Sequence, residues 1–292
     1  MSLALNSQCL LCHLQRNLKL AWQLGDAETA DAFSRELVQQ YMDAPEGASS
    51  PTLGPGVNQL FQKYYGLEPD RYKKEKEASN RFVMERFDSI CAQVEQSEDP
   101  LFAALQFAIL GNYIDFSALQ GDVSFDKLDE MLLKAKDIQV DMDVYHRMLS
   151  ELERGERLLY LTDNAGEICF DRIFGEQLQK AYPHLQIVFC VRGGPAHNDA
   201  LREDAQFVGV PFPVIDNGNC VGGTELSLLS QEAKQAMDSA DVIFAKGQGN
   251  CETLLGCGYN IYYAFLVKCQ RYVEHFGKPL MTPMLVKEPE KK

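Results

Sequence analysis

The sequence predicts an α/β protein: a helical domain over residues 1–153, then a Rossmann-like domain with a mostly parallel sheet over residues 154–292. Two observations lead to this prediction. Apolar residues recur at helical spacing in much of the first 150 residues, whereas beyond the polar segment 153–156 short apolar runs alternate with amphipathic stretches. Such alternation implies right-handed crossovers and a parallel sheet covered by helices on both faces.

The first half is expected to be helical apart from one loop. Asp26 is a good N-cap for the second helix, and the Pro, Gly and Ser content of residues 44–56 predicts a loop. The longest expected helix contains an amphipathic stripe of Val83, Phe87, Ile90, Cys91 and Val94. The expected helices span residues 8–24, 26–42, 70–96, 100–118, 125–137 and 143–153.

In the second half, each short apolar run predicts a buried strand, and the amphipathic stretches between them predict helices. The expected strands span residues 157–162, 186–191, 212–215, 241–245, 260–267 and 280–286. The expected helices span residues 165–182, 198–207, 226–239, 250–257 and 268–276.

Composition limits the partners that the protein can bind. The chain has 292 residues and a net charge of −14, which disfavours nucleic acid and anionic membrane surfaces, since both require a basic face. A small anion can still bind where cations are concentrated locally, and a divalent ion would supply such charge. No apolar stretch approaches the ~20 residues that span a bilayer. The N-terminus lacks the basic region of a secretory signal, and the nine cysteines are an odd number. We therefore expect a cytoplasmic protein with reduced cysteines.

The segment TDNAGE (162–167) follows the first expected strand and opens a helix. Ligands of open α/β sheets bind beyond the carboxyl ends of the strands, and a helix N-terminus there favours anions. Asp163 and Asn164 are therefore candidate ligand-binding residues. The alternative is that one of them only caps the helix. Glu167 either completes that cap or faces the site.

The segment RGGPAHNDA (192–200) follows the second expected strand, one βα unit later. This spacing can bring Asp199 to Asp163, with Asn164 as a neutral third oxygen donor for a magnesium-like ion. Asn198 is a neighbouring candidate. Arg192 either binds a phosphate or caps sheet carbonyls, and we interpret His197 as a loop residue.

The segment KGQGN (246–250) follows the strand VIFA. Lys246 is a candidate phosphate-binding residue, and Gly247 and Gly249 leave backbone N–H groups free to approach an oxyanion. Taken alone, this segment is better explained as a glycine turn. It matches neither the Walker loop nor the dinucleotide fingerprint.

The motifs DNAGE, RGGPxxNDA and KGQGNxE, in this order, resemble the damage-control phosphatase family, also known as domain of unknown function 89 or the acidic-residue-methyltransferase-like metal-binding domain. The resemblance covers nearly the whole chain. CLLCHLQ (9–15) is similar to the cysteine-pair opening of its prokaryotic branch, and GNYID (111–115) to its helical-domain motif. It implies a helical region packed on a Rossmann-like domain, and a metal-dependent phosphatase acting on small phosphometabolites.

The resemblance also implies residue roles. The metal ligands would be Asp163, Asn164 and Asp199, Lys246 would hold the substrate phosphate, and Asn112 would reach the active site from the helical domain. The cation would be Mg²⁺, Mn²⁺, Co²⁺ or Ni²⁺. On a helix, Cys9, Cys12 and His13 would share one face. No second cysteine pair completes a zinc set, so we favour a packing role, with zinc binding and redox chemistry as the alternatives.

We therefore expect metal-assisted hydrolysis of a phosphomonoester, with either water or Asp163 as the nucleophile. Lys246 and Arg192 would stabilise charge on the phosphoryl oxygens. Two alternatives are carried forward. One is an S-adenosylmethionine-dependent carboxyl methyltransferase, although no glycine-rich loop follows the first strand and Arg192 stands where an acidic residue would bind ribose. The other is a non-catalytic metal- or metabolite-binding module. The sequence does not specify the substrate, the oligomeric state or the role of the cysteine pair.

Overall fold

The computed structural model describes residues 3–113, 130 and 132–290. At its centre is a six-stranded sheet in the order β3-β2-β1-β4-β5-β6. Neighbouring strands are parallel except β6, which pairs antiparallel with β5. Each strand overlaps one that the sequence predicts, so the α/β fold class is confirmed. The strands are β1 (Arg157–Leu161), β2 (Gln186–Val191), β3 (Val214–Asp216), β4 (Val242–Lys246), β5 (Ile261–Leu266) and β6 (Pro283–Lys287).

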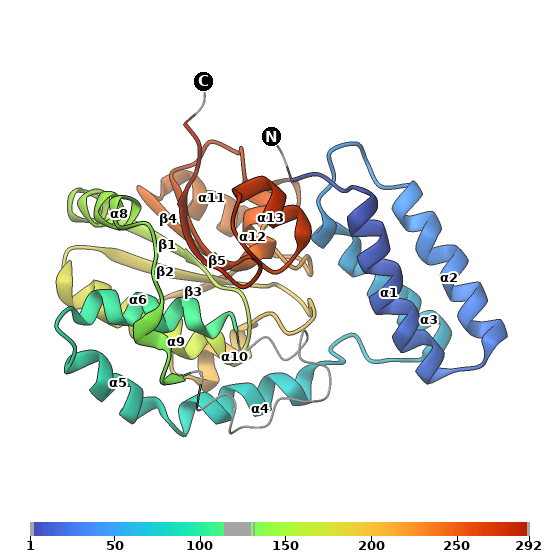
Figure 1. Ribbon diagram of the computed structural model, residues 1–292, viewed down its shortest axis with the longest axis horizontal. Coiled ribbons are helices and arrows are strands. Elements are labelled where there is room, and N and C mark those ends of the chain that lie inside the picture. The colour runs from blue at the N-terminus through green and yellow to red at the C-terminus, as the bar shows by residue number, and fades with distance from the viewer. Residues whose placement is uncertain (1–2, 114–129, 131, 291–292) are drawn as a thin grey trace.

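The sheet is buried on both faces because successive side chains of each strand point to opposite sides. In β1, Leu158 and Tyr160 join the hydrophobic cluster on one face, and Leu159 and Leu161 join the cluster on the other. Figure 1 shows helices on the two sides of the sheet. The first face packs against α4 (Lys73–Met84), α5 (Phe87–Glu95), α6 (Pro100–Gly111), α8 (Met142–Arg154), α9 (Glu167–Ala181) and α10 (Arg202–Phe207), and the second against α11 (Gln231–Ser239), α12 (Gly247–Leu254) and α13 (Gln270–Phe276).

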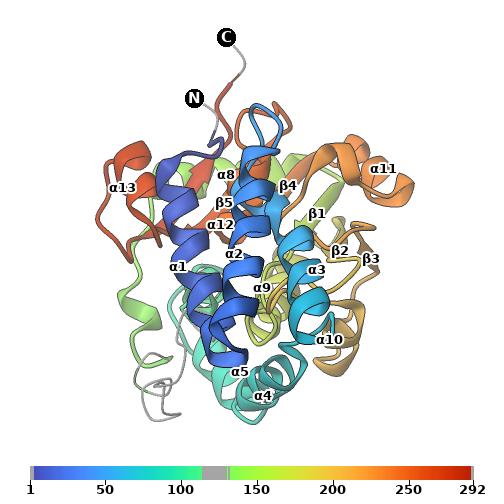
Figure 2. The same cartoon turned by 90° about the vertical axis from the view of Figure 1, so that its right-hand side faces the viewer.

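The first three helices form a bundle with a hydrophobic cluster of its own. They are α1 (Ser7–Leu24), α2 (Ala27–Met42) and α3 (Gly54–Tyr65), and their shared core contains Phe33 and Phe61 with ring centroids 4.7 Å apart. This bundle lies at the right of Figure 1 and faces the viewer in Figure 2. The cluster on the first sheet face, in contrast, joins helices before residue 154 to strands after it. The division at residues 153 and 154 stays a prediction.

Two expected elements of the helical region were wrong. The predicted helix over residues 70–96 is two helices, because the chain turns at Glu85 and Arg86 while the guanidinium of Arg86 lies 3.8 Å above the Phe82 ring. The buried stripe residues of both helices still join one core. The predicted loop over residues 44–56 ends in a short 3-10 helix (Ser50–Leu53) and the start of α3. Pro55 is tolerated there because the first helical turn needs no proline N–H.

Smaller differences concern the connecting helices. The predicted helix 100–118 corresponds to α6, and its residues 114–118 lie outside the described residues. Of the predicted helix 125–137, residues 125–129 and 131 lie outside them, and Ala135–Asp137 forms a 3-10 turn. The helix expected at 226–239 starts with a 3-10 turn at Leu226–Leu228, before α11. Across the described ranges, no helix combines the length and apolar content that crossing a bilayer requires.

The strand order creates the crevice in which the site lies. From β1 the chain adds β2 and β3 on one side and then returns to place β4 on the other side of β1. The connections after β1 and β4 therefore leave the sheet in opposite directions. Ligands of open α/β sheets bind at such a switch point, beyond the strands' carboxyl ends.

Packing of α6 against α9 is expected to stabilise the sheet and the helices on its first face. Phe170 of α9 is fully buried and stacks on Phe107 of α6, with centroids 6.0 Å apart. Phe170→Ala should lower the free energy of unfolding by about 3–5 kcal/mol, measured by urea denaturation, because it leaves a cavity in this core. The control Met42→Ala, at a side chain 69% exposed, should change it by less than about 0.5 kcal/mol. Equal effects of the two substitutions would contradict this packing argument.

Candidate active site

The segments after β1 and β2 meet directly at the carboxyl edge of the sheet. Asn164 and Asp199 form an isolated antiparallel bridge. The Ala165 N–H donates to the carbonyl of Asn198 at 2.9 Å, and the Ala200 N–H donates to that of Asp163 at 2.8 Å. These backbone bonds place Asp163, Asn164 and Asp199 together, as their positions after neighbouring strands predict.

Asp163 lies at the centre of this cluster and is almost completely buried. Its Oδ2 accepts hydrogen bonds from the side-chain amides of Asn164, at 2.8 Å, and Asn112, at 3.0 Å. Burial, followed by the nearby carboxylates of Glu167 and Asp199, holds the pKa of Asp163 well above its usual range, while Arg192 and Lys268 act in the opposite direction. A cation beside Asp163 would therefore stabilise the carboxylate form.

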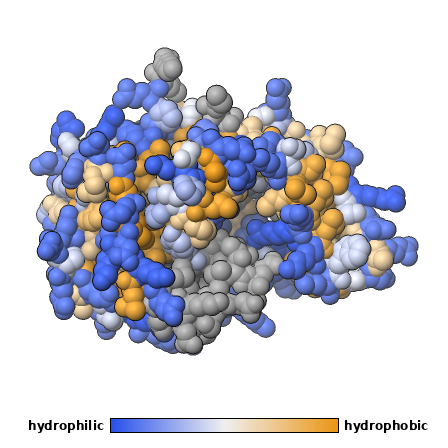
Figure 3. Space-filling view, viewed as in Figure 1, coloured by the Kyte–Doolittle hydropathy of each residue, from blue (hydrophilic) through white to orange (hydrophobic). Residues whose placement is uncertain are grey.

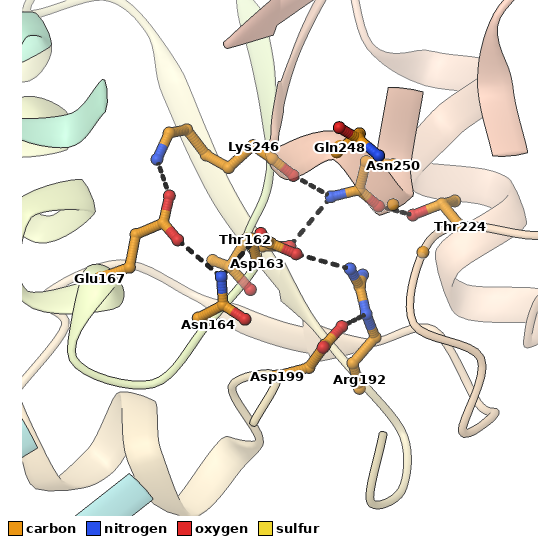
Figure 4. A network of polar contacts seen from close by, with 12 residues as sticks. Thr162, Asp163, Asn164, Glu167, Arg192, Asp199, Thr224, Lys246, Gln248 and Asn250 are labelled. Carbon is orange, nitrogen blue, oxygen red and sulfur yellow. Dashed lines mark hydrogen bonds and ion pairs between the residues drawn. The ribbon is translucent and has the colours of Figure 1, made fainter. Parts of the chain in front are cut away.

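Arg192 fixes the second carboxylate. Its Nε donates to Asp199 Oδ2 at 2.6 Å, and its Nη2 lies 3.8 Å from Asp163 Oδ1 (Figure 4). The side chain is buried, and it does not line the cavity described below. Arg192 thus holds the two aspartates in place.

Lys246 is completely buried, and its ammonium binds protein groups. It pairs with Glu167, donates to the carbonyl of Ala108 at 2.7 Å, and lies 3.1 Å from Asp171 Oδ1. Burial raises the pKa of Asp171 to about 7, although Lys246 opposes this shift. In this arrangement Lys246 connects β4 to α6 and α9 below the site.

Glu167 and Asn112 link this ion pair to the aspartate cluster. Asn112 Nδ2 donates to both Glu167 oxygens, at 3.1 and 3.0 Å, and Asn164 Nδ2 donates to Glu167 Oε2 at 3.0 Å. Asn112 and Glu167 are both fully buried. Glu167 therefore accepts a hydrogen bond from the amide nitrogen of Asn164, and Asn112 holds Glu167 in place. The amide oxygen of Asn164 is directed away from Glu167.

The two glycines of KGQGN allow close approach of backbone. Gly247 begins α12 with φ +82°, and a Cβ there would lie 1.9 Å from Asp163 Oδ2. A Cβ at Gly249 would lie 2.0 Å from the carbonyl oxygen of Gly222. Asn250, which the sequence analysis did not single out as a functional residue, joins β4 to β1 by donating to the carbonyls of Lys246, at 2.6 Å, and Thr162, at 3.0 Å (Figure 4).

A cavity of about 240 Å³ lies between this edge of the sheet and α1. Figure 3 shows, beside α1, a hollow between the helical bundle and the body, with hydrophobic side chains gathered over α1 itself. The candidate residues that line the cavity are Asp163, Asn164, Asn198, Asp199 and Gly249, together with the loop residue His197. The candidates outside its lining are Asn112, Glu167, Arg192, Lys246 and Gly247.

Several other residues that line the cavity were not predicted from the sequence. Lys268 follows β5, so the same strand-end reasoning could have found it. Cys12, His13 and Arg16 come from α1, and their arrival at the sheet edge depends on long-range packing that no local pattern reports. Cys9 and Cys12 are both free thiols, and Cys9 Sγ accepts from Arg271 Nη1 at 3.4 Å. The role of the pair stays open.

The side chains at the sheet edge fit a hard divalent cation. Asp163 and Asp199 offer carboxylate oxygens and Asn164 an amide oxygen, which are the donors that Mg²⁺ and Mn²⁺ prefer. Within the described part of the chain, no group of three or more His, Cys, Asp or Glu side chains is placed to hold a metal ion. The predicted set has only two such residues, because its third member is an amide.

Polar cavities at the switch point of an α/β sheet are where such proteins bind small molecules, and this places the chain among α/β proteins with a small-molecule site. The comparisons are more specific. Residues 5–282 match the family described as the damage-control phosphatase ARMT1-like domain, and the chain belongs to this family. The predicted family is thereby confirmed; its branch with the N-terminal cysteine pair stays a prediction.

Two proteins named as damage-control phosphatases are similar to this chain, and the crystal structure of one of them superposes on it. A damage-control phosphatase of Pyrococcus horikoshii is 36% identical over 60% of this chain and 61% of its own length. One of Archaeoglobus fulgidus is 29% identical over 92% of this chain and 93% of its own. The crystal structure of the Pyrococcus horikoshii protein, described there as a DUF89 family protein, superposes with a TM-score of 0.84, at 26% identity, over 98% of this chain and 99% of that one. The match supports the fold as described.

The Lys246 network should stabilise the fold strongly. Lys246→Met leaves Glu167 and Asp171 as buried carboxylates without their cation, and should lower the free energy of unfolding by about 3–5 kcal/mol in chemical denaturation. Adding Glu167→Gln to that variant should restore part of the loss, because it removes one uncompensated charge. This interpretation would be contradicted if the double variant lost more free energy of unfolding than the two single variants lose together.

Glu252, on the α12 wall of the cavity, should make stability depend on pH. Burial raises its pKa to about 7, against the hydrogen bond from Gln248 and the charge of Arg271. A carboxyl whose folded pKa is raised stabilises the fold at low pH and loses this contribution between about pH 4.5 and 7. The stability of Glu252→Gln relative to the parent should thus rise over that window, by on the order of 1–3 kcal/mol in urea titrations. Parallel curves of unfolding free energy against pH for the parent and Glu252→Gln would contradict this prediction.

Proposed function

We propose that this protein is a divalent-metal-dependent phosphatase that hydrolyses small phosphorylated metabolites. The observation that carries the proposal is the meeting of Asp163, Asn164 and Asp199 at one end of a polar cavity, at the sheet's switch point. Family membership supports the phosphatase reaction. The cavity, at about 240 Å³, supports a small substrate.

Asp163, Asn164 and Asp199 would hold the cation, with Mg²⁺, Mn²⁺, Co²⁺ and Ni²⁺ as candidates. A bound divalent ion would polarise a phosphoryl oxygen and neutralise charge that develops during the reaction. The raised pKa of Asp163 is in keeping with this assignment, because burial and the carboxylates of Glu167 and Asp199 disfavour its charged form, and a cation beside it would offset both effects.

The residues behind the cluster would position it. Arg192 holds Asp199 through its Nε, and Glu167 holds the amide nitrogen of Asn164, which directs the amide oxygen away from Glu167. Lys246 in turn holds Glu167. We assign Arg192, Glu167 and Lys246 as positioning residues on this basis.

The positive charge beside the phosphate would come from Lys268, which lines the cavity and lies close enough to lower the pKa of Asp163. Charge fixed at this place would stabilise the phosphoryl oxygens as negative charge shifts during hydrolysis. The nucleophile is either water or Asp163 itself. Asn112 and Asn164 both donate to Oδ2 of Asp163, so attack by Asp163 would use its other oxygen, Oδ1.

Substitution of the proposed ligands tests the function. Asp163→Asn and Asp199→Asn should each lower metal-stimulated turnover of para-nitrophenyl phosphate by at least about 100-fold, because each removes a carboxylate from the ion and the reacting phosphate. The assay uses protein stripped with chelator and then given each cation in turn. Chelation alone should abolish turnover, and one of the cations should restore it.

The matched control is Asp216→Asn, at the end of β3, where the carboxylate pairs with Arg202 outside the cavity. It should keep turnover within about twofold of the parent. Retained activity in Asp163→Asn would refute the assignment. Equilibrium binding of S-adenosylmethionine without phosphatase turnover would favour the methyltransferase, and metal binding without either would favour the binding module.

A further inference from the structure

Two arginines lie close together, and one of them lines the cavity. Arg16 lies on α1 and lines the cavity. Arg71 lies just before α4, with its guanidinium 4.3 Å from the Phe61 ring centroid and 5.2 Å from that of Tyr72. The two are close enough that Arg16 lowers the pKa of Arg71, in addition to the larger effect of burial.

Several guanidinium nitrogens of this pair are buried without a hydrogen-bond acceptor. They are Arg16 Nη2 and Arg71 Nε and Nη1. Among the described residues, neither arginine has a carboxylate within ion-pair distance, although the chain has 42 acidic residues against 28 basic ones. Buried charged donors without acceptors are costly, so these nitrogens call for a partner such as an ordered water or a bound anion.

Neighbouring groups do not supply the missing negative charge. The guanidinium carbon of Arg71 lies over the rings of Phe61 and Tyr72, and the Tyr72 hydroxyl also interacts with it, but neither neighbour carries a full negative charge at neutral pH. His13, one turn before Arg16, also lines the cavity, and its ring contacts the hydroxyl of Ser50 at 2.9 Å. Burial lowers the pKa of His13, and the positive charge of Arg16 lowers it further.

We propose that Arg16, supported by Arg71, binds a second anionic group of the substrate, so that the natural substrate is a phosphomonoester that also carries a carboxylate or a second phosphate. This rests on the proposed function, since it assigns the phosphate to the aspartate end of the same cavity. A guanidinium presents paired N–H donors that match the oxygens of either anion. One cavity thus has an acidic wall for the metal and a basic wall for the second anion.

Matched substrate pairs test the proposal. 3-Phosphoglycerate and glycerol 3-phosphate have the same carbon chain and differ by a carboxylate, while propane-1,3-diol bisphosphate and its monophosphate differ by a phosphate. The parent protein should prefer the member with the extra anion in at least one pair, measured as kcat/KM with the activating cation. The pair with the larger preference identifies the anion.

Arg16→Gln should reduce that preference by about 10- to 100-fold, as expected for a lost charge-assisted contact. Arg16→Lys should show a preference between those of the parent and Arg16→Gln, because it keeps the charge and loses the paired donors. Lys19→Gln, an exposed cation on the same helix, is the control and should leave the preference unchanged. Circular dichroism checks folding. If Arg16→Gln does not fold, the test uses the preference of the parent protein and its reduction in Arg16→Lys.

Two results would overturn the proposal: a parent protein that prefers neither extra anion, or an Arg16→Gln variant in which kcat/KM falls equally for both members of the preferred pair. Absence of turnover on every phosphate ester would count against the proposed function instead. In that case, calorimetric titration with 3-phosphoglycerate and glycerol 3-phosphate decides the question. Loss of discrimination in Arg16→Gln would support the anion site, and equal affinities in the parent would overturn it.

Discussion

The ion pair of Lys246 with Glu167 and Asp171 is the interaction on which the site depends. A fully buried ammonium requires acceptors on every side, and here they come from α6 and α9 while the lysine itself ends β4. Since Glu167 also receives hydrogen bonds from Asn112 and Asn164, the charge pair fixes the geometry of the aspartate cluster above it. The site is thus coupled to the core, so a change at the ion pair affects both the fold and the chemistry.

The parts of the site that sequence could predict are those set by the backbone. Polar residues after neighbouring parallel strands must share one edge of the sheet, which is why Asp163, Asn164 and Asp199 were found together. The direction of a side chain is a different matter. Lys246 and Arg192 stand at strand ends as predicted, yet both bind carboxylates of the protein, because buried acids nearby compete for them. Only the three-dimensional packing shows that competition.

Long-range packing also explains what the sequence did not predict in the fold. The sheet and most helices follow from apolar periodicity, whereas the break between α4 and α5 depends on how each half meets the core. The start of α3 was not predicted, because Gly54 and Pro55 usually mark loops, although both are compatible with a first helical turn. The contribution of α1 to the cavity wall lacks any local signal, because it connects positions more than 100 residues apart.

The helical bundle with its own hydrophobic cluster has a consequence for how such a protein can diversify. Arg16 and His13 stand on a helix whose packing is largely with α2, whereas the acid and amide groups belong to the sheet. Substitutions on the cavity side of α1 would therefore alter which molecules are accepted without disturbing the groups that act on them. On the proposed assignments, recognition and chemistry would be carried by separately stabilised parts of one chain, so that each could change under selection while the other is kept.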